Sequence, residues 1–175
     1  MVSTTIISQQ DLSSEFDKAT KELMQLLIAF GQQQINTKPP EGGWTAAQVG
    51  EHLFKSDTAI LKALYGPVKD TVRAADKHVN SINRAFLDFS TKMKSPGMII
   101  PEDIEHDKEA MISALKSTRD LLGKAIKTLD LSPICTDPDM SSIVGEWTRQ
   151  EYVNFVISHT YRHIHQLKKI FNNTQ

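Results

Sequence analysis

The sequence predicts an all-α fold, a four-helix bundle with an added helical crossover. Apolar residues recur at helical spacing in four long segments, which are separated by clusters of Pro, Gly and polar residues. No β-hairpin pattern stands out. About 35 residues separate the second segment from the third, which is enough to carry the chain back along a helix of roughly 30 Å. Helices two and three are therefore expected to run parallel.

The first helix is expected from Gln10 to about Gln34, after a polar start. Lys, Glu and Gln residues are interspersed among apolar residues that share one face: Phe16, Leu23, Leu27 and Phe30. The segment from Asn36 to Gly43 contains two adjacent prolines and two adjacent glycines, so it ends this helix in a turn.

The second helix is expected to begin at Thr45 and to reach about Leu64. Thr45 and Gln48 have the spacing of a capping box, in which each side chain bonds to the other residue's backbone N–H. Gly66-Pro67 ends the helix. His52 lies at the margin of the apolar stripe, which comprises Val49, Leu53, Ile60 and Leu64.

The crossover is expected to contain a helix from Asp76 to about Met93 that packs outside the four-helix core, because apolar residues recur there between two breakers. The third helix is expected to start near Pro101, where acidic residues suit a helix N-terminus. Its stripe comprises Ile104, Met111, Leu115, Leu122, Ala125, Ile126 and Leu129. The segment from Leu131 to Val144 contains two prolines and is expected to be a loop.

The fourth helix, from Thr148 to about Phe171, carries two histidines in the middle of its apolar face. Thr148 and Glu151 again have the spacing of a capping box. His159 and His163 lie one turn apart on the buried stripe, whose other members are Tyr152, Val156, Leu167 and Ile170. Each buried imidazole needs a partner. Hydrogen bonds to neighbouring helices are one solution, and a shared metal ion is the other.

The composition of the chain argues against several classes of partner and location. The 175 residues fit one domain spanning 1–175, and a net charge of −1 argues against nucleic acid or an anionic membrane as the main partner. The lone Cys135 can form no internal disulfide, lies in the expected loop and fits a reducing compartment. No signal-peptide pattern and no stretch of roughly 20 apolar residues occurs, so a cytoplasmic protein is expected.

Three segments together resemble the DinB-like superfamily, which includes bacillithiol and mycothiol transferases: Gly43–Leu53, Phe86–Phe89 with Ser95–Pro101, and His159–His163. The resemblance extends over nearly the whole chain. It implies an up-down-down-up bundle, in agreement with the expected parallel crossover. It also implies a divalent metal held by His52, His159 and His163.

Three neutral imidazoles with an open position match a catalytic metal site, where a bound water or thiol becomes acidic. The expected function is a metal-dependent thiol S-transferase or hydrolase acting on a small electrophile, with a low-molecular-weight thiol as a candidate co-substrate. The alternative is a non-catalytic metal-binding or plain helical-bundle interaction module, and a homodimer is considered for it. Imidazole serves Zn, Ni, Fe and Mn, so the ligands do not identify the ion.

No general base is assigned, because Glu51 and Asp57 are expected to point away from His52. Candidate neighbours of the ligands are Gln48, Ser56 and Gln166, while His78, His106 and His165 are expected to be exposed. Because imidazole binds a cation only when neutral and has an unperturbed pKa of about 6.5, metal affinity is expected to fall from about pH 7 to pH 5.

Overall fold

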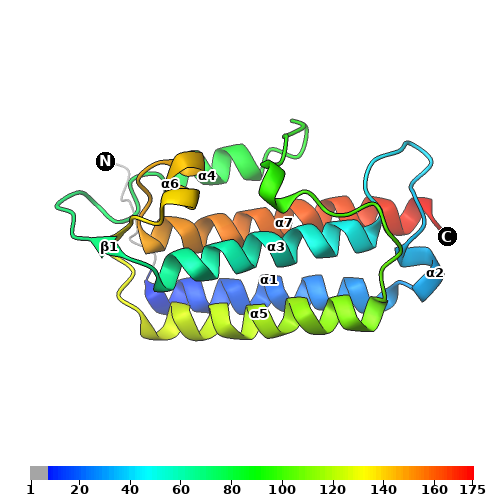
Figure 1. Ribbon diagram of the computed structural model, residues 1–175, viewed down its shortest axis with the longest axis horizontal. Helices are drawn as coiled ribbons and strands as arrows, with labels where there is room; N and C mark the ends of the chain where they lie inside the picture. The colour runs from blue at the N-terminus through cyan, green and yellow to red at the C-terminus, as the bar shows by residue number, and fades with distance from the viewer. Residues whose placement is uncertain (1–7) are drawn as a thin grey trace.

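A computed structural model describes residues 8–175, and its core is a bundle of four long helices (Figure 1). They are α1 (Gln9–Ala29), α3 (Ala46–Tyr65), α5 (Lys108–Thr128) and α7 (Arg149–Asn173). Helices α3 and α5 run in the same direction, opposite to α1 and α7, so the bundle is up-down-down-up. The all-α prediction and the parallel pair are confirmed. The polar start lies largely in residues 1–7, outside the described residues.

Both predicted capping boxes are present. The Thr45 hydroxyl accepts from the Gln48 N–H at 3.1 Å, and the Gln48 side chain accepts from the Thr45 N–H at 3.0 Å. Thr148 and Glu151 form the same pair of bonds at the start of α7. These bonds satisfy N–H groups that would otherwise be unpaired at a helix end, so they fix where the two histidine-bearing helices begin.

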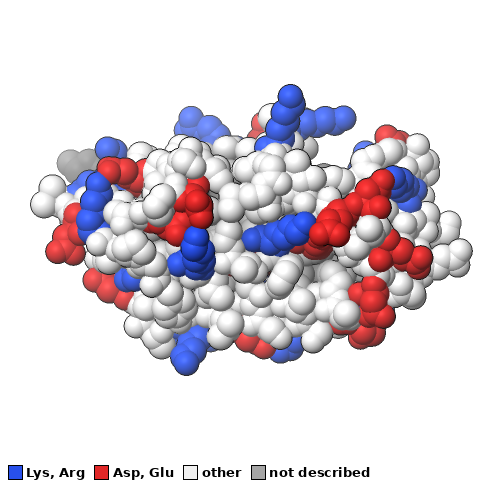
Figure 2. Space-filling view, in the orientation of Figure 1, with Lys and Arg blue, Asp and Glu red and all other residues white. Residues whose placement is uncertain are grey.

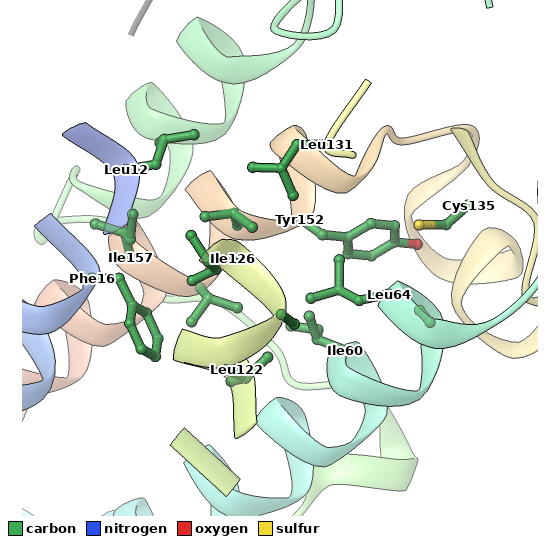
Figure 3. Close-up of a cluster of buried hydrophobic side chains, with 14 of the residues drawn as sticks. Leu12, Phe16, Ile60, Leu64, Leu122, Ile126, Leu131, Cys135, Tyr152 and Ile157 are labelled. Atoms are coloured by element: carbon green, nitrogen blue, oxygen red, sulfur yellow. The ribbon is translucent and has the colours of Figure 1, made fainter. Parts of the chain in front are cut away.

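The buried face of α7 follows the predicted stripe, with Tyr152, Val156, His159, His163, Leu167 and Ile170 all buried. One apolar cluster fills the end of the bundle where α7 begins, and Tyr152 is one of its buried members (Figure 3). The Tyr152 hydroxyl points toward the sulfur of Cys135. Cys135 is buried in the short strand β2 (Ile134–Cys135), which pairs with β1 (Val68–Lys69), and burial raises the pKa of its thiol to about 11. The expectation of a loop thiol was wrong.

Two helix boundaries differ from the prediction. The first long helix ends at Ala29, and the separate turn α2 (Gln32–Ile35) follows after Phe30 and Gly31 adopt extended conformations. The third begins at Lys108, not near Pro101, because Asp107 caps it by accepting from the Ala110 N–H. The acidic segment before it is not helical and is hydrogen-bonded to side chains of α3, and Ile104 is 59% exposed and does not join the stripe.

The crossover is less helical than predicted. Its helix α4 covers only Val79–Phe86, packs on α7 outside the four-helix core, and is followed by turns and the 3₁₀ turn η1 (Gly97–Ile99). The expected loop from Leu131 to Val144 contains β2 and the short helix α6 (Pro138–Val144), which Asp137 caps.

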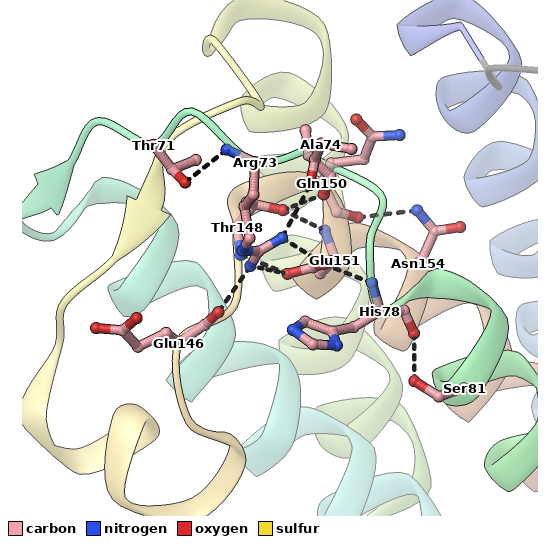
Figure 4. Close-up of polar contacts among 11 residues, drawn as sticks. Thr71, Arg73, Ala74, His78, Ser81, Glu146, Thr148, Gln150, Glu151 and Asn154 are labelled. Carbon is pink, nitrogen blue, oxygen red and sulfur yellow. Dashed lines mark hydrogen bonds and ion pairs between the residues drawn. The ribbon is translucent and has the colours of Figure 1, made fainter.

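A buried ion pair fixes the start of α7 to the segment that precedes α4 (Figure 4). The Glu151 carboxylate accepts from Arg73 at 2.7 and 2.9 Å, from the His78 N–H at 2.7 Å and from the Thr148 N–H at 2.8 Å. Four donors thus satisfy one fully buried carboxylate. The pair links α7 to the crossover at the end of the bundle far from the C-terminus.

Charge on the visible face is mixed: Lys and Arg lie among Asp and Glu, without a large patch of one sign (Figure 2). In residues 8–175, no helix is both long and apolar enough to cross a membrane.

Candidate metal centre

Three histidines from two helices meet inside the bundle. His52 lies in the second turn of α3, and His159 and His163 lie one turn apart on α7. The Nε2 atom of His159 is 3.1 Å from that of His52 and 2.9 Å from that of His163. One ring nitrogen from each residue falls within 4.8 Å of the other two. The structure therefore brings together all three residues that the sequence analysis selected.

The other nitrogen of two of these rings is already engaged. His52 Nδ1 lies 2.9 Å from the carbonyl oxygen of Ile99, and His163 Nδ1 lies 2.8 Å from Oε1 of Gln166. Both partners are acceptors, so each Nδ1 carries the proton and donates it. In a neutral imidazole the remaining nitrogen is then a lone-pair acceptor. The Nε2 atoms of His52 and His163 both point lone pairs toward His159.

This arrangement has one acceptor too many. His159 Nε2 carries at most one proton, so it can donate to either His52 or His163 and not to both. The surplus lone pair would be left unsatisfied in a buried site. A cation shared by the three Nε2 atoms removes the conflict. Two nitrogens bound at about 2 Å to a tetrahedral ion lie about 3.3 Å apart, close to the two separations observed here.

Burial keeps the three rings neutral. Loss of hydration lowers the pKa of His163 to about 3, with the nearby His52 as a second cause. Loss of hydration also lowers the pKa of His159 well below its usual value, and His163 and His52 add to the effect. For His52, desolvation lowers the pKa while the bond to Ile99 opposes it. Neutral imidazole is the form that binds a metal.

Aromatic rings surround the cluster. The Phe155 ring stacks on His159 at 5.0 Å between ring centroids, and Phe86 of α4 meets the same ring edge-on at 5.8 Å. The ring centroid of Trp44, which precedes α3, lies 4.9 Å from that of His52. The Trp44 side chain is partly buried and packs against the core. An apolar surround lowers the local dielectric and strengthens electrostatic interactions within the site.

The predicted neighbours differ in their roles. Gln166 directly contacts His163, as anticipated. Gln48 serves its capping box and donates to the carbonyl of Glu102, and Ser56 is buried. Of the histidines expected to be exposed, only His165 is fully so. His78 is half-buried. His106 is also half-buried, with its Nε2 3.3 Å from the Glu51 carboxylate, because the segment before α5 packs against α3.

Neither nearby carboxylate of α3 is hydrogen-bonded to the cluster. Glu51 accepts from the Glu102 N–H at 2.8 Å and pairs with Lys55 at 2.7 Å. Asp57 is buried, and its Oδ2 lies 3.0 Å from Nε of Arg119 on α5. The expectation that both point away from His52 agrees with these contacts.

Two groups near the histidine cluster were not predicted from the sequence: the Arg119 side chain and the Ile99 carbonyl. Arg119 is a cation at a stripe position of α5, four residues after Leu115 and three before Leu122, and that spacing was a usable signal. The Ile99 carbonyl that binds His52 left no such signal, because any residue type can supply a backbone oxygen.

The crossover covers the cluster. His52, His159 and His163 are 2%, 5% and 7% exposed. Arg162, on α7 between the two histidines, donates to the carbonyls of Asp88 at 2.9 Å and of Thr91. The helices that carry the histidines therefore also hold the covering segment in place.

Comparison with known proteins gives one family match. The family model of the DinB superfamily matches residues 15–167. YuaE of Bacillus subtilis (strain 168), named only as an uncharacterized protein, is 26% identical over an alignment of 161 residues that covers 90% of this chain and 95% of YuaE.

A solved structure has the same fold. YfiT from Bacillus subtilis, described as a probable metal-dependent hydrolase with an unusual four-helix bundle topology, matches with a TM-score of 0.61 and 16% identity. The match covers 98% of this chain and 90% of YfiT. At this identity the likeness shows the fold alone.

Proposed function

The chain belongs to the DinB superfamily, and on that basis we propose that it is a divalent-metal-dependent enzyme whose ligands are His52, His159 and His163. The observation that carries the proposal is the convergence of three Nε2 atoms with too few protons to satisfy one another. A bound cation is the simplest group that satisfies all three.

The chain's own residues fix the ligands. The Ile99 carbonyl and the Gln166 amide each hold one ring in the tautomer that presents Nε2, which is the usual role of groups behind metal-bound histidines. When bound, a divalent ion acts as a Lewis acid and supplies a nucleophile at neutral pH by lowering the pKa of water or of a thiol. The apolar rings around the cluster keep bulk water away from that nucleophile.

Hydrolysis or thiol transfer to a small electrophile follows from this chemistry. Among the described residues, the nearby carboxylates Glu51 and Asp57 are engaged elsewhere, so no side chain is assigned as the nucleophile. The description of YfiT as a probable metal-dependent hydrolase supports the hydrolytic branch. A low-molecular-weight thiol is the co-substrate of the other branch, and a small molecule is the substrate of both. We also propose that residues 1–175 form one domain.

The test begins with elemental analysis of untagged protein, followed by assay of the metal-loaded protein against small electrophiles with and without cellular thiols. We expect one divalent ion per chain and turnover that His163→Ala abolishes. Product formation only with a thiol assigns the transferase branch, and product formation with water alone assigns the hydrolase branch. Equal turnover by wild type and His163→Ala would contradict the proposal.

Burial of the cluster favours a second candidate, a non-catalytic metal-binding module. Rings that are 2–7% exposed leave little access for a substrate unless the crossover moves. The two candidates differ in whether a small ligand reaches the bound ion. Cobalt-loaded protein should change its visible absorption when azide is added if the site is catalytic, because azide occupies an open position. An unchanged spectrum favours the non-catalytic module, for which a homodimer is the proposed assembly.

A further inference from the structure

One buried guanidinium contacts all four bundle helices. Arg119 of α5 donates from Nη2 to the Thr160 hydroxyl of α7 at 2.8 Å and from Nη1 to the Thr20 hydroxyl of α1 at 3.1 Å. Its Nε lies 3.0 Å from the Asp57 carboxylate of α3. The side chains of Arg119 and Asp57 are each 1% exposed. This four-residue contact is the polar junction of the bundle.

A contribution to the stability of the fold does not explain why the polar junction is present. Two charges have been removed from water, and among residues 8–175 no donor hydrogen-bonds to Oδ1 of Asp57. Burial raises the pKa of the Asp57 carboxyl, and the charge of Arg119 opposes that shift. Replacing such a buried pair with apolar residues is often neutral or stabilising. A buried ion pair is better suited to fixing how helices align, since each charge accepts few alternative positions.

Two of the helices joined by the junction, α3 and α7, carry the three histidines. Thr160 directly follows His159 on α7. Asp57 lies five residues after His52 on α3, which is about 7.5 Å of helix rise. Joining both to one guanidinium fixes the axial position of α3 relative to α7. The Nε2 atoms of His52 and His159 must meet across those two helices, within 3.1 Å of each other.

We propose that Arg119, Asp57 and Thr160 are positioning residues of the three-histidine site: their junction fixes α3 against α7 so that His52 meets His159 and His163. The role given to these residues rests on the proposed metal-dependent function. The geometry of the junction does not depend on that proposal. Thr20 belongs to the same junction and joins α1, which carries none of the three histidines. Only the contacts on the histidine-bearing helices should therefore affect the metal site.

The test compares Thr160→Val with Thr20→Val. Each removes one hydroxyl that accepts from the same guanidinium and keeps a β-branched side chain of similar volume. Zinc affinity is measured by competition with a chromophoric chelator, and cobalt absorption reports the ligand geometry. We expect Thr160→Val to weaken zinc binding about tenfold and to alter the cobalt spectrum, as groups behind metal ligands do. Thr20→Val should leave both unchanged. Equal effects of the two variants would overturn the proposal.

A second variant removes the charges together. Asp57→Leu with Arg119→Met should keep the cooperative melting transition while zinc binding weakens at least tenfold. Wild-type affinity and spectrum in this folded double variant would overturn the positioning role. If wild type itself takes up no zinc, the proposed function fails, and the metal-free crystal structure of Thr160→Val decides the inference. The Nε2 atoms of His52 and His159 should then lie farther apart than 3.1 Å, and an unchanged separation would overturn it.

Discussion

At the scale of single residues, the folded state changes the pH dependence expected from free imidazole. With unperturbed pKa values, protons would compete with the metal between about pH 7 and 5. Burial lowers the pKa of His163 to about 3 and that of His159 well below its usual value. Proton competition at these two rings in the folded protein therefore begins at lower pH. The earlier expectation took no account of desolvation.

The same shifts predict acid destabilisation of the metal-free protein. A base whose pKa is lower when folded binds more protons in the unfolded chain, so the free energy of unfolding falls as pH drops below about 6.5. For His163 the loss continues until about pH 3. The slope should be about 1.4 kcal/mol per pH unit for each fully neutral ring. Urea melts of wild type at several pH values, in the presence of a chelator, measure it.

The variant that checks this slope is His163→Ala, which should reduce it by the contribution of one ring. Gln33→Leu is the control, because it replaces an exposed side chain of α2 that does not ionise and should leave the slope unchanged. The same slope in wild type and His163→Ala would show that His163 does not resist protonation in the fold.

Gln166 should affect metal binding without being a ligand. Its Oε1 accepts the Nδ1 proton of His163 at 2.8 Å, which holds the ring in the tautomer that presents Nε2. Gln166→Leu should therefore weaken zinc affinity about tenfold, measured by chelator competition. Gln33→Leu, the same change at an exposed position of α2, should have no effect. No loss of affinity in Gln166→Leu would mean that the amide does not orient the ring.

Most of the candidate site could be predicted from the sequence, because two of its three histidines belong to one helix with a clear apolar stripe. Helical spacing alone placed His159 and His163 on the buried face of α7. The selection of His52 required the family resemblance, since its position at the margin of the α3 stripe did not specify its partner. The Ile99 carbonyl and the Arg119 junction depend on contacts between distant segments, which periodicity does not encode.

At the scale of elements, the start of α7 depends on a buried ion pair. Glu151→Gln should leave Arg73 without its carboxylate, so a loss of about 3–5 kcal/mol in the free energy of unfolding is expected. Glu146→Gln is the control: it removes a carboxylate from an exposed pair with Lys69 and should change stability little. Urea denaturation of both variants measures the difference. Equal losses would argue that burial of Glu151 has no energetic consequence.

The crossover segment should be the part of the site that opens. Arg162 holds it through the carbonyls of Asp88 and Thr91, and Lys55 binds the carbonyl of Ile100 at 3.1 Å. Arg162→Ala should accelerate amide hydrogen exchange in residues 87–101 while exchange in α1 and α5 stays slow. Lys92→Ala, an exposed change within the same segment, should leave exchange near wild type. Uniform acceleration across the protein would indicate global destabilisation and not local release.

Helix boundaries were predictable where a capping signal stood next to an apolar stripe. Thr45 and Thr148 met both conditions, and α3 and α7 begin there. The predicted start of the third long helix was wrong, because the acidic residues after Pro101 resembled a first helical turn. The residue that caps α5 is Asp107. Hydrogen bonds to Glu51 and Gln48 of α3 hold that acidic segment outside the helix, and a pattern local to the segment does not encode contacts with another helix.

At the scale of the whole molecule, the topology and the metal proposal depend on each other. The parallel arrangement of α3 and α5 requires the long crossover, and the crossover supplies the Ile99 carbonyl that orients His52. The antiparallel pair α3 and α7 then brings His52 against the two histidines of α7. Connection length was the sequence feature that predicted this topology, because a short loop would have made the second and third long helices antiparallel.

X-ray absorption at the zinc edge of protein loaded with one equivalent of zinc is the most direct test of the central claim. Imidazole rings give a characteristic outer-shell signal, so the number of histidine ligands can be counted. We predict three imidazole nitrogens at about 2.0–2.1 Å, with the shell completed by an oxygen or sulfur ligand from outside the chain. His52→Ala should lose one of the three. A zinc shell with one imidazole or none in the wild-type protein would contradict the account.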